Sequence, residues 1–476
     1  MPRRVVRVLK ADGDQLHDAV DAIAEEVGVT AAFPSEVEAA AARAAKHPRM
    51  PDLDRTDIEL VTIDPAGSMD LDQALHLERD GDGFVVHYAI ADVAAFVSPG
   101  DAVDVEANRR GETFYGAGST IPLHPRVLCE GAASLLPGEV RPALLWTLRV
   151  DPSGEGTDVR VERARVRSRA KLAYASLQAQ IDAGTADPMF ALLREVGELR
   201  KQREAARGGV SLPLPEQEIE VDGDDWSLRF RKMLPVEEWN SQISLLTGFG
   251  AASLMVYARV GLLRTLPPPD TRDVQRLHRT AKALHIDWSA EQLYPDFIRS
   301  LDPDRPTHAA MITACTRLLR GSGYVGFNGE VPAQPEHAAL ASEYAHVTAP
   351  LRRLVDRYAG EICVALCAGA DVPKWVLERL DELPKTMAES ARRAHTYENS
   401  LVSLVEAAVL RRHVGESFPG VVVAVDDGDE THGDLVVQEP AIEATVTSQR
   451  PLPLGTDVEV RLVEADVPAR RVRFEL

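Results

Sequence analysis

Hydrophobic and polar positions change their spacing several times along the chain, and each change predicts a different kind of element. Residues 1–50 predict a short strand at 5–9, followed by two helices rich in alanine and glutamate with a break at 33–35. Between about 51 and 150, apolar residues alternate with polar ones around turns such as 80–83. This alternation predicts hairpins in a mixed β region.

Helical spacing takes over in the middle of the chain. Residues 172–207 and 236–263 each predict a helix, and the prolines at 267–269 predict a rigid break before further helices. We expect helices to dominate through about residue 413.

The last 60 or so residues change character again. Short β-branched runs alternate with Gly, Asp and Pro turns, at residues 421–425, 434–437, 444–446 and 458–462. Such spacing predicts a small barrel of the oligonucleotide-binding type. The tail has few aromatic and many acidic residues, so oligonucleotide binding by the barrel and a role as an interdomain support both stay open.

Length and charge limit the classes of function. A chain of 476 residues exceeds one compact domain, and we predict an α+β protein with a short N-terminal region at 1–50, a main domain at 51–413 and a barrel at 414–476. The net charge of −21 argues against a general nucleic-acid coat. It allows a narrow basic channel, for which the cationic stretches at 160–171 and 200–207 are candidates. Solvated surfaces explain such stretches equally well.

Cysteine usage and hydropathy indicate the cellular compartment of the protein. The four cysteines show no metal-binding spacing and are expected as buried thiols of a reducing compartment, at Cys129, Cys315, Cys363 and Cys367. The N-terminus lacks the apolar stretch of a signal peptide, and no run of about 18 apolar residues occurs. We therefore expect a cytoplasmic protein without a membrane partner.

Candidate chemistry lies between residues 62 and 74, where Asp64, Asp70 and Asp72 follow an apolar run. Several carboxylates beside a substrate phosphate are the ligand set that Mg²⁺ prefers. An acidic surface loop is the alternative reading of this segment. The spacing of Asp70 and Asp72 places both on one face of an extended strand, and no calcium-loop glycine follows them.

The same segment resembles the catalytic signature of the ribonuclease II/ribonuclease R (RNB) family. The resemblance continues in family order over roughly residues 50–405, in the segments 87–93, 113–115, 121–125, 207–216, 236–238 and 344–353. It implies the RNB catalytic domain, a mixed β-sheet region surrounded by helices, followed by an S1-like barrel. The cold-shock modules of longer relatives have no counterpart in residues 1–50, which puts processivity and tight RNA anchoring in doubt.

The resemblance also implies roles for single residues. Asp64, Asp70 and Asp72 match the acids that hold Mg²⁺, with Mn²⁺ as the alternative, and that organise the attacking water. Asp72 is expected to be the residue most sensitive to loss. Gln73 stands where the family usually carries a fourth aspartate. Its amide carbonyl remains a candidate metal ligand that contributes no charge, and weaker binding of one metal is expected.

Further matches concern the RNA. Tyr115 matches an aromatic residue that packs on the terminal nucleotide. Arg352 matches the arginine that meets the scissile phosphate, with Arg353 as its neighbour. Glu398 matches a glutamate that positions the 3′ ribose, and Glu389 is the competing position.

These matches predict a hydrolytic 3′-to-5′ exoribonuclease that degrades single-stranded RNA to nucleoside 5′-monophosphates with a metal-activated water. Two alternatives stay open. The first is a catalytically impaired RNA-binding or assembly protein on the same fold, motivated by Gln73, the missing modules and the acidic composition. The second is a metal-dependent phosphoesterase that acts on short oligonucleotides.

Overall fold

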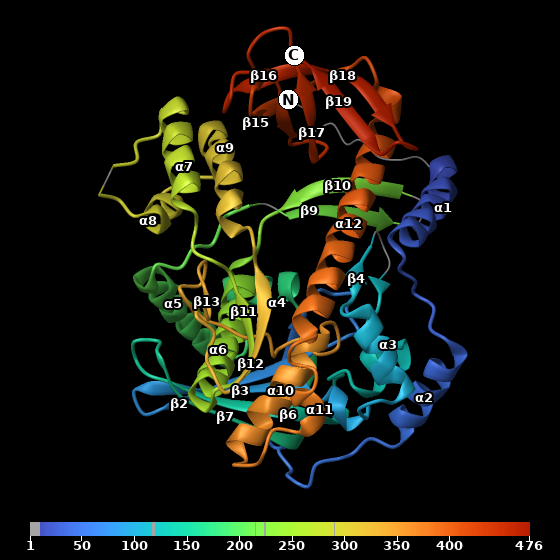
Figure 1. Cartoon of the computed structure of the whole chain (residues 1–476), viewed down its shortest axis with the longest axis vertical. Coiled ribbons are helices and arrows are strands. Elements are labelled where there is room, and N and C mark those ends of the chain that lie inside the picture. The colour runs from blue at the N-terminus through green and yellow to red at the C-terminus, as the bar shows by residue number, and fades with distance from the viewer. Residues whose placement is uncertain (1–9, 117–119, 215, 223–224, 290) are drawn as a thin grey trace.

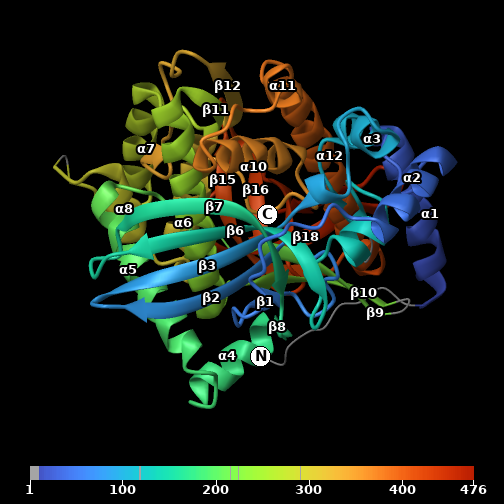
Figure 2. The same ribbon diagram turned by 90° about the horizontal axis from the view of Figure 1, so that it is seen from below.

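A mixed six-stranded sheet forms the base of the molecule in Figure 1 and is seen from below in Figure 2. The computed structural model describes residues 10–116, 120–214, 216–222, 225–289 and 291–476, so the strand predicted at 5–9 lies outside the described residues. The sheet has the order β7-β6-β3-β2-β1-β8, formed by β1 (Val61–Asp64), β2 (Gln73–Asp80), β3 (Gly83–Ala91), β6 (Val140–Val150), β7 (Gly156–Arg167) and β8 (Ala170–Ala173). Neighbouring strands are antiparallel except β1 and β8, which are parallel. The hairpin expected around residues 80–83 is confirmed as the β2–β3 turn.

Both faces of the sheet are covered because its strands carry apolar side chains on both sides. Tyr88 of β3 and Trp146 of β6 pack with helices on one face, namely α5 (Met189–Arg207), α6 (Pro235–Ala258) and α10 (Leu354–Cys367). Ala89 of β3 belongs to the cluster on the other face, where α2 (Ser35–Lys46), α3 (Ala102–Arg110) and the single turn η2 (Leu128–Ala132) lie. Burial of each large apolar side chain contributes about 1.5–3 kcal/mol. The sheet edge that carries the acids is therefore held on a rigid layer.

Two predicted helices have different bounds from those expected. The helix expected at 236–263 ends at Ala258, because Arg259 adopts a left-handed conformation with φ 58° and the next residues form β11 (Val260–Thr265). Strand β11 pairs with β12 (Gly323–Asn328), which no local pattern predicts. The stretch expected as one helix at 172–207 is divided into α4 (Tyr174–Asp182) and α5 around Gly184, whose φ is 68°.

The remaining elements surround this core. They are α1 (Lys10–Val27), the turn η1 (Val93–Ala95), the hairpin β4 (Phe114–Tyr115) and β5 (Thr120–Ile121), the ribbon β9 (Glu216–Asp222) and β10 (Asp225–Arg231), the helices α7 (Thr271–Ala283), α8 (Tyr294–Arg299) and α9 (Pro306–Cys315), the turn η3 (Thr316–Leu319), the short pair β13 (Glu336–His337) and β14 (Ser342–Glu343), α11 (Lys374–Leu377), the long α12 (Leu383–Leu410) and the turn η4 (Arg411–His413). Helix α12 extends from the barrel at the top of Figure 1 toward the sheet at its base. The predicted break at 33–35 is confirmed between α1 and α2.

The C-terminal barrel is confirmed. Five strands close in the order β15-β16-β17-β19-β18, formed by β15 (Ser417–Asp426), β16 (Asp429–Val437), β17 (Ile442–Thr447), β18 (Asp457–Asp466) and β19 (Arg471–Glu475). Its apolar interior belongs to the same buried cluster as side chains of α1, α12 and β10. The barrel is thus packed onto the catalytic body rather than attached through a linker alone.

Other expectations concern cysteines and the membrane. Cys129, Cys315 and Cys363 are buried, whereas Cys367 is half-buried. Within the described ranges, no helix combines the length and the apolar character needed to cross a membrane.

Candidate active site

The predicted carboxylates lie where β1 turns into β2. Asp64 is the last residue of β1, and Asp70 and Asp72 belong to the loop before β2. Asp70 interacts electrostatically with both Asp64 and Asp72. A short turn therefore gathers the three acids into one cluster.

Neighbouring segments hold this acidic loop in place. The backbone N–H of Leu71 donates to Ser134 Oγ at 2.9 Å, and this hydroxyl donates to the carbonyl of Met69 at 2.6 Å. Lys171 on β8 donates from Nζ to the carbonyl of Ala66 at 2.9 Å and also to that of Ser68. A loop braced from two sides can keep like charges close together.

Asp72 and Arg352 form an ion pair in the site, although 280 positions separate them in the sequence. Arg352 Nε donates to Asp72 Oδ2 at 2.8 Å, and the backbone N–H of Leu351 donates to Oδ1 at 2.8 Å. Only 2% of Asp72 is exposed. Burial raises the pKa of Asp72 to about 7, against the opposing effects of Arg352 and the Leu351 N–H.

Asp64 provides the test of whether the acids fit a cation. Burial raises the pKa of Asp64 to about 6, and its Oδ2 atom is buried without a hydrogen-bond partner. A desolvated carboxylate oxygen without a donor fits a bound cation. In the described part of the chain no group of three His, Cys, Asp or Glu side chains is arranged to hold a metal ion. The unpartnered oxygen of Asp64 is thus compatible with a cation, and the metal role of Asp64, Asp70 and Asp72 stays a prediction.

The amide of Gln73 is used inside the protein. Its Nε2 donates to the carbonyl of Thr348 at 2.7 Å, and its Oε1 accepts from the Tyr88 hydroxyl at 2.6 Å. The same hydroxyl lies 2.7 Å from Ser244 Oγ. The side chain thus ties β2 to the segment before Arg352, and the metal role of Gln73 stays a prediction.

Tyr115 lies beside Arg352. The backbone N–H of Thr113 donates to the carbonyl of Arg352 at 2.9 Å, which aligns the two segments. The Arg352 guanidinium donates to the Tyr115 hydroxyl oxygen, and 42% of Tyr115 is exposed. A partly exposed aromatic ring beside a guanidinium and three carboxylates is suited to a nucleotide base next to its phosphate.

Arg353 has a different environment from Arg352. Its Nε and Nη2 donate to the two oxygens of Asp356, each at 2.8 Å, and Asp356 Oδ1 also accepts from the backbone N–H of Ala349 at 2.7 Å. The structure therefore places Arg353 in a bidentate ion pair that fixes the turn before α10. Its predicted contact with RNA stays a prediction.

Glu398 lies apart from the acidic cluster. It is exposed on α12, and its recorded electrostatic partners are His395 and Glu112. The competing Glu389 is exposed on the same helix. None of the three aspartates is among these partners, and the predicted contact of Glu398 with the 3′ ribose stays a prediction.

Glu112 was missed from the sequence. It directly precedes the segment 113–115, and its Oε1 is buried without a partner. Burial raises its pKa, opposed by Ser390 and Arg353. Its position directly before the family-like segment 113–115 could have identified Glu112 from the sequence. The sequence also did not reveal that Lys171 holds the acidic loop, because a cationic stretch alone does not show which carbonyls its lysine contacts.

Both cationic stretches proposed for a channel have structural partners. On α5, Arg200 donates to the carbonyl of Gly154, and Lys201 pairs with Glu238. On β7, Arg163 pairs with Asp92 and also with Glu361. These pairs favour the structural reading of the two stretches.

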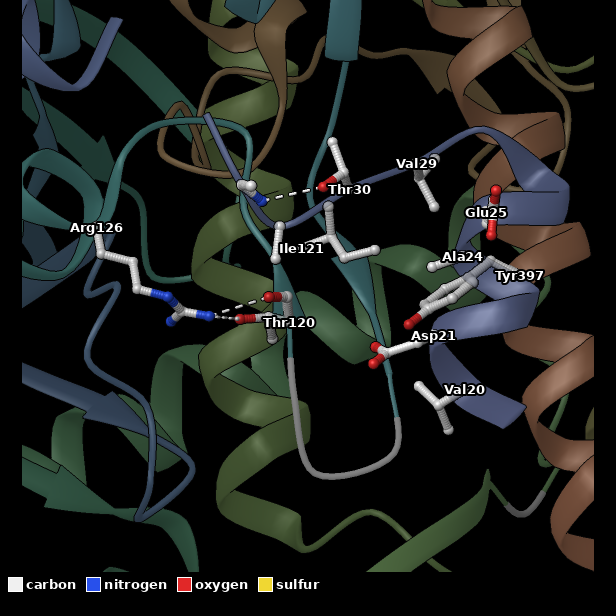
Figure 3. Close-up of a pocket in the computed structure, with 12 residues that line it drawn as sticks. Val20, Asp21, Ala24, Glu25, Val29, Thr30, Thr120, Ile121, Arg126 and Tyr397 are labelled. Atoms are coloured by element: carbon white, nitrogen blue, oxygen red, sulfur yellow. Dashed lines mark hydrogen bonds between the residues drawn. The ribbon is translucent and has the colours of Figure 1, made fainter. Parts of the chain in front are cut away.

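A pocket of about 490 Å³ lies between α1, β5 and α12 (Figure 3). Asp21, Glu25 and Tyr397 line it, and Arg126 donates to the carbonyl of Thr120. None of the predicted site residues lines this pocket. The acids and Arg352 therefore form a site separate from it.

Comparison with known proteins identifies two families of domains. Residues 53–367 match the RNB domain, and residues 416–476 match the RNase II-type exonuclease C-terminal S1 domain. The exosome complex exonuclease RRP44 homolog A of Arabidopsis thaliana is 28% identical over 318 residues, which cover 64% of this chain and 34% of that protein. Ribonuclease R of Aquifex aeolicus is 24% identical over 453 residues, which cover 87% of this chain and 63% of that protein. The chain spans 34% to 46% of the length of the first four curated relatives it matches.

Solved structures share the fold. Mycoplasma genitalium RNase R in complex with ribose-methylated single-stranded RNA matches 97% of this chain and 78% of its own, with a TM-score of 0.86 and 18% identity. Yeast Ssd1, a pseudonuclease, matches 85% of this chain and 51% of its own, with a TM-score of 0.67 and 16% identity. The fold is therefore shared by a ribonuclease and by a protein without nuclease activity.

Proposed function

The chain belongs to the RNB family, and from this premise we propose that it is a hydrolytic exoribonuclease that shortens single-stranded RNA from the 3′ end and releases nucleoside 5′-monophosphates. The observation that carries the proposal is the pairing of Arg352 with Asp72 beside Tyr115. It unites a phosphate-binding group, an acidic cluster and a stacking surface from three distant segments.

The arginine, the aspartates and the tyrosine of the site would have different roles in the reaction. Asp72 accepts from Nε of Arg352, and the Tyr115 hydroxyl accepts from the same guanidinium. The remaining N–H groups of Arg352 would bind phosphate oxygens and stabilise negative charge in the transition state. Asp64 and Asp70 would hold a Mg²⁺ or Mn²⁺ ion. When bound, such an ion lowers the pKa of a coordinated water and neutralises developing charge. Tyr115 would pack on the terminal base, for which stacking is worth about 1–3 kcal/mol.

A time course with 5′-labelled single-stranded RNA tests this proposal. With Mg²⁺ or Mn²⁺, the wild-type protein should shorten the RNA progressively from the 3′ end, and mass spectrometry should identify nucleoside 5′-monophosphates. Asp72→Asn should abolish cleavage and leave RNA affinity largely intact. Addition of EDTA should stop the wild-type reaction, and excess Mg²⁺ should restore it. Cleavage by Asp72→Asn at the wild-type rate would contradict the role of this carboxylate.

A second candidate is an RNA-binding protein on this fold without nuclease activity. The internal hydrogen bonds of the Gln73 amide favour it, because they occupy both ends of a side chain at a predicted metal position. RNA that stays intact with either metal, together with measurable RNA binding, would support this candidate. A phosphoesterase for short oligonucleotides would instead cleave short RNA and leave long RNA intact.

A further inference from the structure

Basic side chains gather on α7 and the adjoining turn η3, although the chain as a whole carries a charge of −21. On α7, Arg272, Arg276 and Arg279 are spaced by four and three residues, so they form one stripe along the helix. The buried Leu277 and Ala281 lie on the opposite face. The stripe is therefore turned away from the core of this helical region.

Several of these cations lack an acidic partner. Some surface arginines elsewhere are paired, as in the contacts Arg79–Glu195 and Arg471–Glu464, whereas single exposed arginines such as Arg392 and Arg450 stand apart from a stripe of this kind. Among the residues that the structure describes, no hydrogen-bonded or ion-paired partner is recorded for the side chains of Arg272, Arg279, Lys282 and Arg320. All four are exposed. Unpaired cations on an acidic protein mark a surface that attracts an anionic partner.

The cations continue from α7 into η3 and onward to the β11–β12 ribbon. Arg317 on η3 is in electrostatic contact with Arg276 and Arg320. Two residues after Arg320, the Ser322 hydroxyl accepts from Arg264 Nη2 at 2.9 Å. Figure 1 shows the ribbon β11–β12 between α7 and α9 above it and the sheet below it.

The ribbon leads to the candidate active site. The Arg264 guanidinium lies over the Tyr324 ring, 4.8 Å from its centre. The Tyr324 hydroxyl lies 2.7 Å from His346 Nδ1, and Tyr324 is in electrostatic contact with Arg353. Arg353 is the chain neighbour of Arg352. Through Tyr324, Arg264 is therefore connected to the segment that carries Arg352.

We propose that these residues form a track for the upstream phosphates of single-stranded RNA whose 3′ end lies at Arg352. We define the basic track as Arg272, Arg276, Arg279, Arg317, Arg320 and Arg264. This inference rests on the proposed function, because it assumes that the 3′ end of the RNA reaches Arg352. It assigns the side of entry, along α7 and η3 beside the barrel. A track of arginines that contacts only the phosphate backbone binds without sequence preference.

An acid of the barrel occupies part of the track. Asp427, in the turn between β15 and β16, pairs with Arg276 and lies 3.9 Å from Arg317. A carboxylate in this place competes with a phosphate for the same guanidinium groups. Removal of this charge should therefore change RNA affinity in the opposite sense to removal of the arginines.

Binding measurements with short and long RNA test the track. Fluorescence anisotropy with 5′-labelled RNA of about 5 and about 25 nucleotides is measured in an Asp72→Asn background, so that the RNA stays intact. Arg317→Glu/Arg320→Glu should weaken binding of the long RNA about 10-fold or more and should flatten its salt dependence by about 0.7 in log–log slope per lost contact. Binding of the short RNA should not change. Arg264 lies nearer to the site than Arg320. Arg264→Gln should therefore weaken the binding of RNA that is too short to reach Arg320.

Two further variants distinguish a specific effect of the track from a general effect of charge. Lys374→Glu reverses one charge on α11, where 88% of the side chain is exposed, and should leave both affinities unchanged. Asp427→Asn should tighten binding of the long RNA. Equal effects of the track variants and of Lys374→Glu, or equal effects on short and long RNA, would overturn the track. If the wild-type protein degrades both RNAs in that case, the proposed function stands without the track; if it degrades neither RNA, the exoribonuclease proposal itself fails.

Discussion

Asp72 and Arg352 determine each other's position in the site. The aspartate has both oxygens engaged by Leu351 and Arg352, and it is almost fully buried. Loss of either partner leaves a desolvated charge, which costs more than the ion pair itself contributes. Removal of either charge is therefore expected to destabilise the site, whereas a substitution that keeps the charge is expected to act mainly on catalysis.

Arg352→Lys should reduce the catalytic rate rather than the stability. Lysine keeps the charge but loses the planar fork that binds both Asp72 and phosphate oxygens. We expect kcat to fall about 10²–10³-fold with a small change in KM. Single-turnover and steady-state cleavage of labelled RNA measure the two parameters. An unchanged kcat would exclude a transition-state contact by Arg352.

Arg353→Lys is the matched control because the adjacent arginine is bound to Asp356. Loss of the bidentate pair should lower the free energy of unfolding by about 1–3 kcal/mol. Chemical denaturation measures this change. A loss of kcat equal to that of Arg352→Lys, with unchanged stability, would instead support the RNA contact predicted for Arg353.

Gln73→Glu tests whether the hydrogen bond that the Gln73 amide donates stabilises the protein. A carboxylate cannot donate to the carbonyl of Thr348, so two acceptors would face each other in a half-buried place. We expect a loss of about 1–3 kcal/mol of stability. The exposed Gln202→Glu carries the same charge change and should be neutral. Unchanged stability of Gln73→Glu would show that the Thr348 contact is dispensable.

At the scale of elements, α12 connects three parts of the molecule through one buried acid. Glu406 Oε1 accepts from Gln217 Nε2 and from the backbone N–H of Glu443, each at 2.8 Å. These donors belong to β9 and β17. The helix is thus tied to the β9–β10 ribbon and to the barrel by a single carboxylate.

Glu406→Gln should remove a component of the pH dependence of stability. Burial raises the pKa of Glu406 from 4.5 to about 7, so the native state holds a proton that the unfolded state has lost. The stability should therefore fall as pH rises from 4.5 to about 7, by about 3 kcal/mol from this group. Glutamine keeps both hydrogen bonds and has no charge to desolvate.

Denaturation of both proteins between pH 5 and about 8 measures this difference. The variant should match the wild-type protein at low pH and exceed its stability at high pH. The exposed Glu459→Gln should follow the wild-type curve. Parallel curves for Glu406→Gln and the wild type would show that the carboxylate titrates alike in both states.

At the scale of the whole molecule, the barrel and the catalytic body share an apolar cluster. Phe418 and Phe474 of the barrel belong to the same buried cluster as Leu404 and Leu410 of α12 and Leu16 of α1. Separation of the two parts would expose this surface to water. The barrel therefore stabilises the helix that runs beside the site.

We expect the protein to unfold in one cooperative transition. Differential scanning calorimetry should show a single peak whose calorimetric and van't Hoff enthalpies agree. A chain shortened to residues 1–413 should aggregate or lose α12, because the shared cluster would lose its barrel half. Two separate peaks would show that the barrel folds on its own.

The sequence alone was sufficient for features that depend on local patterns or on collinear motifs. The β2–β3 hairpin, the break between α1 and α2 and the closed barrel follow from turn residues and alternation. The acids at 64–72 were recognisable as a group because they lie within one turn. Local periodicity also extended the helix 236–263 too far, because the pairing of β11 with β12 is a long-range contact.

Only the tertiary structure decided which side chains face each other. It paired Asp72 with Arg352, enclosed the Gln73 amide between Tyr88 and Thr348, and bound Arg353 to Asp356. It also gave the cations of the stretch 160–171 structural partners and left Arg272, Arg279 and Arg320 exposed. The reason is that a residue type and its spacing specify what a group can bind, whereas burial and distance between remote segments specify what it does bind.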